Sequence, residues 1–95
     1  MRAALILVVL ALVVAPASAK AAAVPPLVAA CSGCHAANGG DPTLPRLAGR
    51  NAGEIVAAMK AFRTGSRPAT VMDRIAKGFT DDEIAVIAAW YAKQR

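Results

Sequence analysis

Both cysteines and the only histidine of the 95-residue chain fall within five consecutive positions, Cys31-Ser32-Gly33-Cys34-His35. A C-x-x-C-H spacing is typical of a site where haem is attached covalently. The two thiols are three residues apart, so both can add to the vinyl groups of one porphyrin. His35 directly follows the second thiol and can offer a ring nitrogen to the iron as an axial ligand. The motif therefore predicts one covalent haem c.

Two other types of site use the same residues. A C-x-x-C pair also occurs as a disulfide or a thioredoxin-like redox pair, but the thioredoxin fold needs strands, and no segment here has a convincing strand pattern. A structural zinc site needs four ligands, and this sequence offers three within one turn and no fourth candidate elsewhere. If no haem is attached, a disulfide between Cys31 and Cys34 in a small binding module remains the alternative.

The N-terminal segment has the pattern of an export signal. Arg2 is followed by an apolar run from Ala3 to Val14 and by the small residues Ala17-Ser18-Ala19, the order of a secretory signal peptide and its cleavage site. We therefore expect residues 1–19 to be a cleaved signal peptide and residues 20–95 to form the mature domain. The apolar run is shorter than the roughly 20 residues of a membrane-spanning helix, so an uncleaved anchor is the weaker alternative. We expect no membrane span in the mature chain.

Composition limits the partners of such a domain. The chain has 11 Lys and Arg against 6 Asp and Glu, a net charge of +5, which indicates either a solvated basic surface or docking on an acidic partner. We do not expect nucleic-acid binding, because aromatic residues are few and no binding motif is present. A domain this small rarely folds on its apolar core alone, and a covalent haem would supply the missing apolar surface.

Helical signals flank the motif and predict an all-α fold. The run 27–32 reads as a short apolar helix that carries the cysteines, and residues 36–50 are rich in turn residues. Asn51 and Glu54 then form an N-cap and N3 pair. The apolar residues after them have the spacing of an amphipathic helix that stops at Gly65: Ile55, Val56, Met59 and Phe62. Met59 is therefore expected in the core.

The C-terminal third contains an irregular segment followed by a well-capped helix. Residues 67–72 carry no helical periodicity, and extended chain there would let Met72 approach the iron from the side opposite His35. Thr80 and Glu83 form a capping box. The helix after it has one apolar face, made of Ile84, Ile87, Ala88 and Tyr91.

The loop after the haem motif contains a stretch that resembles the Pro-x-Leu-x-Gly sequence of class I c-type cytochromes, Pro45-Arg46-Leu47-Ala48-Gly49. The order of helix, haem motif, loop, helix, methionine segment and terminal helix extends the resemblance to the whole mature chain. It implies a small monohaem fold of short helices packed around one haem. It also implies that the Pro45 carbonyl accepts a hydrogen bond from His35, and that Met72 is the second axial ligand. The terminal helix would cross the helix of the haem motif, with Ala88 facing Ala29 or Ala30 and with Trp90 or Tyr91 covering a haem edge.

A narrower resemblance is carried by three runs, 47–50, 62–68 and 71–80. They are similar to the cytochrome subunit of flavocytochrome c sulfide dehydrogenase. The resemblance implies a periplasmic protein that performs no catalysis alone, accepts single electrons from a sulfide-oxidising flavoprotein containing FAD, and passes them to another cytochrome. Arg67, Arg74 and Lys77 flank Met72 and are candidates for binding a haem propionate or for docking.

Two other functions remain open at this point. One is a free-standing soluble cytochrome c that carries electrons to a terminal oxidase or reductase. The other is a five-coordinate haem protein that binds small gases or peroxide, which requires that Met72 does not ligate the iron.

Overall fold

The computed structural model describes residues 24–38 and 40–95, and within these ranges it contains four helices and no strand. The helices are α1 (Pro26–Ser32), α2 (Ala52–Thr64), α3 (Met72–Ala76) and α4 (Asp81–Ala92). The all-α prediction is therefore confirmed. The predicted signal peptide, residues 1–19, lies outside the described residues.

The helix ends follow from local sequence. Pro26 occupies the first turn of α1, where its missing N–H is no loss. Asn51 caps α2 by accepting hydrogen bonds from Gly53 N and Glu54 N at 2.8 and 3.3 Å. Gly65 ends α2 in the left-handed region, at φ 79°, a conformation that costs glycine little.

The predicted capping box of α4 is also present. Thr80 Oγ1 accepts from Glu83 N at 3.2 Å, and Thr80 N donates to Glu83 Oε1 at 2.9 Å. The apolar face of α4 is buried as predicted. α4 is thus a capped helix with its apolar face in the core.

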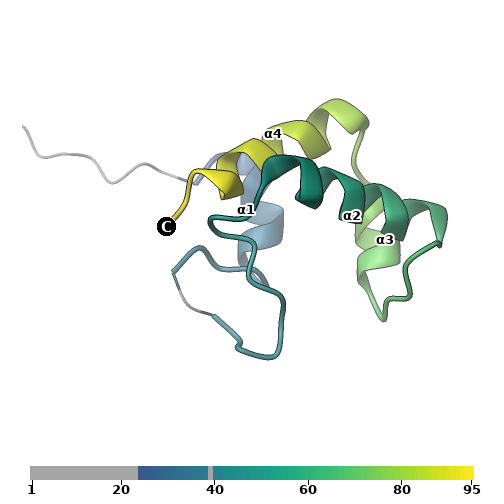
Figure 1. Ribbon diagram of the computed structural model, residues 1–95, viewed down its shortest axis with the longest axis horizontal. Helices are drawn as coiled ribbons and strands as arrows, with labels where there is room; N and C mark the ends of the chain where they lie inside the picture. Colours follow the sequence, from purple (N-terminus) through teal and green to yellow (C-terminus); the bar gives the residue numbers. More distant parts are fainter. Residues whose placement is uncertain (1–23, 39) are drawn as a thin grey trace, which may run out of the picture.

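The core lies where α4 packs against α1 and α2. Its buried side chains are Val28, Ile55, Met59, Ala76, Ile84, Ile87, Ala88 and Tyr91. Figure 1 shows α2 and α4 side by side and α1 crossing beneath α4. Of the residues expected to meet Ala88 from α1, Ala29 and Ala30 are both exposed, and Val28 is the fully buried one. The exposure of Ala29 and Ala30 does not support that expectation, and a seven-residue helix gives no clear periodicity from which its buried residue could be identified.

The segment before α4 differs from its prediction in one respect. Residues 66–71 are irregular, as expected, but Met72 is the first residue of the short helix α3 rather than part of an extended chain. α3 packs against α2. The long loop between Gly33 and Asn51 and the helix α3 lie on the same side of α2, near its N-terminal and C-terminal ends respectively (Figure 1).

Within residues 24–38 and 40–95, no helix combines the length and the apolar character needed to cross a membrane.

Candidate functional site

A cavity of about 360 Å³ opens between the loop, α2 and α3. Its volume lies within the range of roughly 300–1,000 Å³ that is usual for small-molecule sites. Most of the lining is apolar, and its larger apolar side chains are Leu44, Leu47, Ile55, Met59, Phe62, Val71, Ile75 and Ile87. The cavity is thus a concave, largely apolar site enclosed by most of the elements of the domain.

The predicted haem-binding residues meet in this cavity. Cys31, Cys34 and His35 line it from the α1 side, and Met72 lines it from α3. Both thiols are free, with Cys31 half-buried and Cys34 exposed. Burial raises the pKa of the Cys31 thiol.

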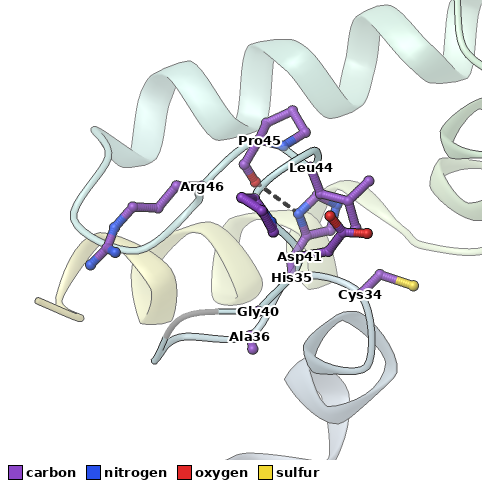
Figure 2. A pocket seen from close by; sticks show the side chains of 9 residues that line it. Cys34, His35, Ala36, Gly40, Asp41, Leu44, Pro45 and Arg46 are labelled. Atoms are coloured by element: carbon purple, nitrogen blue, oxygen red, sulfur yellow. Dashed lines mark hydrogen bonds between the residues drawn. The ribbon is translucent and has the colours of Figure 1, made fainter.

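The ring of His35 is held by a hydrogen bond of 3.0 Å between its Nδ1 and the Pro45 carbonyl oxygen. Figure 2 shows this bond and the side chains around a second, smaller hollow of about 270 Å³ on the Pro45 side of the ring. A carbonyl oxygen can only accept, so Nδ1 carries the proton, and in the neutral ring Nε2 keeps its lone pair. Nε2 is thereby left free to bind a metal.

Met59 and Met72 both line the cavity, but their surroundings differ. Met59 is 6% exposed and belongs to the core cluster, in agreement with the prediction from its place on α2. Met72 is only partly buried and packs at the edge of that cluster. Met72 is therefore the methionine whose side chain is less committed to the core.

Among the residues that the structure describes, two arginines line the cavity and no acidic residue does. The Arg67 guanidinium lies 4.8 Å from the centroid of the Phe62 ring, a cation–π contact that fixes it at the rim. Arg50 also lines the cavity and pairs with Glu54 at 3.7 Å. This positive rim fits a ligand that carries carboxylates.

The sequence did not single out Arg50 as a site residue, although its position directly after the Pro45–Gly49 stretch was a usable signal. The other two predicted cations, Arg74 and Lys77, are exposed and do not line the cavity.

The aromatic residues of α4 have a different place from the one expected. Neither Trp90 nor Tyr91 lines the cavity, so the expectation that one of them covers a haem edge was wrong. Tyr91 is fully buried, and its hydroxyl donates to the His35 backbone oxygen at 2.6 Å. The ring of Trp90 packs edge-on against that of Tyr91, with centroids 5.0 Å apart.

These residues fit a covalent haem. The cavity presents two thiols, one imidazole with a free Nε2, the thioethers of Met59 and Met72, apolar walls and two cations. When bound, a haem of this kind supplies one-electron redox chemistry at its iron.

No family model matches the chain. Among curated proteins, the cytochrome subunit of sulfide dehydrogenase from Chlorobaculum tepidum is 40% identical over 62 residues, which cover 64% of this chain and 56% of that protein. Cytochrome c-554(548) from Halomonas halodenitrificans is 37% identical over 72 residues, covering 70% of this chain and 87% of that protein.

The chain belongs to the monohaem c-type cytochrome family. A third relative, the thiosulfate dehydrogenase electron acceptor of Thiomonas intermedia, is 36% identical over 80 residues, covering 81% of this chain and 37% of that protein. This cytochrome thus spans just over half of the first relative and less than half of the third.

Proposed function

We propose that this cytochrome carries single electrons on one covalent haem c and works in the periplasm as the haem subunit of a sulfide-oxidising flavoprotein. The observation that carries the proposal is the single cavity into which Cys31, Cys34, His35 and Met72 all open. The thiols of Cys31 and Cys34 would attach the haem, His35 Nε2 and the Met72 thioether would bind its iron, and Arg50 and Arg67 would offer positive charge to its propionates.

Two axial ligands leave no position for a substrate, which is why electron transfer is favoured over catalysis by this chain alone. A thioether ligand and apolar surroundings both favour the ferrous state, so the potential should lie above that of a bis-histidine haem. The hydrogen bond from His35 Nδ1 to Pro45 O acts in the opposite direction, because it makes the ring a better donor to ferric iron.

The proposed partner rests on relatives. Two of them are named for dehydrogenases of reduced sulfur compounds, one as a cytochrome subunit of sulfide dehydrogenase and one as an electron acceptor. A free-standing cytochrome is the second candidate, and the high coverage of cytochrome c-554(548) favours it.

Purification from the native periplasm separates these two candidates. Co-elution of a flavin-containing subunit in constant ratio through two different columns supports the first, and a haem protein that elutes alone supports the second.

Carbon monoxide added to the ferrous protein tests the iron ligands. An unchanged spectrum agrees with a bound methionine, and immediate binding indicates a five-coordinate protein that takes gases or peroxide.

The docking surface is tested by charge reversal. Arg74 and Lys77 lie in and just after α3, beside Met72, and both are exposed. If they steer an acidic partner, Arg74→Glu and Lys77→Glu slow electron transfer at low salt, and the difference from wild type fades as salt rises above about 0.1 M, where exposed charges are screened beyond roughly 10 Å. Lys93→Glu is the matched control, because Lys93 is an exposed cation at the C-terminal end of α4. Equal effects of all three variants, or rates that do not depend on salt, would contradict docking at α3.

A further inference from the structure

Tyr91 lies in the last turn of α4 and hydrogen-bonds to two segments, the backbone of His35 and the loop that carries Pro45. Its side chain is fully buried, and its hydroxyl donates a 2.6 Å hydrogen bond to the backbone oxygen of His35. Burial, followed by the nearby Cys31 thiol, raises the pKa of Tyr91 to about 12. The hydroxyl therefore keeps its proton, and can donate, throughout the neutral range.

The backbone of the same residue binds the other segment. Tyr91 O accepts a hydrogen bond of 2.9 Å from Gly49 N, which belongs to the loop of Pro45. Gly49 has φ 76°, and a Cβ at this position would lie 3.3 Å from Gln94 O. The left-handed backbone and the tight approach to the C-terminal end of α4 both favour glycine here, and the loop hydrogen-bonds to α4 through Gly49.

The side chain of Tyr91 thus binds the backbone that carries the imidazole donor, and its main chain binds the loop that carries the acceptor, Pro45 O. Both partners of the 3.0 Å Nδ1 to O bond are therefore carried by segments that hydrogen-bond to Tyr91. We propose that Tyr91 is a positioning residue for His35, holding the Nδ1–H···O bond to Pro45 short and so setting the basicity of the axial ligand. This inference rests on the proposed function in that His35 is taken as an iron ligand.

The test compares the full-length, haem-loaded wild type with Tyr91→Phe, which removes only the hydroxyl. Two quantities are measured: the exchange of the His35 Nδ1 proton with solvent, by NMR of the ferrous protein, and the reduction potential. Loss of one hydrogen bond should speed the exchange roughly two- to tenfold, the range that corresponds to the net stabilisation by a typical hydrogen bond. The potential should rise, because a less basic imidazole stabilises ferric iron less.

The Gly49 amide is an internal check, since its partner is the main chain of Tyr91 and the substitution leaves that bond in place. Retained protection of this amide in Tyr91→Phe, together with faster Nδ1 exchange, supports the proposal. Loss of protection at both sites would mean that the hydroxyl merely holds the helix in place, and would overturn it. Unchanged Nδ1 exchange and an unchanged potential would overturn it as well.

Ile84→Val is the matched control. Ile84 is fully buried on the same helix, does not line the cavity, and loses one methylene in this variant. It should lower the free energy of unfolding without moving the potential or the Nδ1 exchange. If Ile84→Val shifts both as far as Tyr91→Phe does, general loosening of the core explains the result and the proposal is wrong. The haem content of the wild type tests the proposed function independently, whereas the differences between the variants test Tyr91 alone.

Discussion

The two methionines that line the cavity give the most discriminating test of the iron ligands. Met59 is 6% exposed and packed in the core, whereas Met72 is partly buried at the start of α3. Leucine has nearly the volume of methionine but no sulfur, so Met59→Leu and Met72→Leu remove the same atom from two places. We expect Met59→Leu to cost less than about 1.5 kcal/mol of stability and Met72→Leu to remove the iron ligand.

Truncation gives the complementary magnitude. Met59→Ala should cost about 2–5 kcal/mol in the free energy of unfolding, because it leaves a cavity in a core that cannot fully collapse. It should still leave the iron coordination intact, since the thioether of Met72 is untouched.

The assays are denaturant unfolding and the far-red absorption band of the ferric protein, which reports sulfur bound to iron. Met72→Leu should keep the haem attached, abolish the band, lower the potential and admit carbon monoxide to the ferrous iron. Met59→Leu and Met59→Ala should keep the band. If the band disappears in Met59→Leu and persists in Met72→Leu, the assignment of the axial ligand is wrong.

Three further predictions concern stability and titration. Tyr91 is the only tyrosine, so its tyrosinate absorbance should appear at pH about 12 in the folded protein and near pH 10 in denaturant. Because the pKa of Tyr91 is higher in the folded state, the free energy of unfolding falls as pH rises through this interval. Titration of the folded protein near pH 10 would contradict the burial of Tyr91. Arg63 pairs with the Asp81 carboxylate and lowers its pKa, so the wild type should lose stability as pH falls below about 4 through that lowered pKa. Arg63→Ala should flatten this part of the acid unfolding curve. An unchanged curve would show that the ion pair does not cause this loss of stability. Asn51→Ala should cost about 1 kcal/mol in urea unfolding and Asn51→Ser much less; equal losses would show that the cap hydrogen bond contributes nothing.

Much of the fold was predictable because its signals are local. Asn51 and Gly65 define both ends of α2, and Thr80 defines the start of α4. The apolar spacing on these helices identified Met59 and Tyr91 as buried. These features depend on hydrogen bonds and contacts within one turn of helix, which sequence displays directly.

The short helix α3 could not be predicted in the same way. Five residues give no measurable periodicity, its N-cap residue Val71 makes no side-chain cap bond, and an isolated helix of this length is unstable in water. It is held by packing against α2, which involves the partly buried Met72 and the fully buried Ala76. Only the tertiary structure contains that information.

The site was predictable in its chemistry and less so in its surroundings. The motif named Cys31, Cys34 and His35, but the bond from Tyr91 to His35 joins residues far apart in sequence and has no local signature. The same holds for Arg50, whose position at the cavity depends on the path of the loop before α2.

The central claim is that Cys31 and Cys34 hold one haem through covalent bonds. Intact mass of the protein purified from the native periplasm, measured after denaturation in acid, tests it most directly. We predict the mass of residues 20–95 plus one haem, and this mass should not change in denaturant. A double Cys31→Ala, Cys34→Ala variant should lose the haem entirely under the same conditions. A wild-type mass equal to the polypeptide alone, or to the polypeptide less two hydrogens as in a disulfide, would contradict the claim.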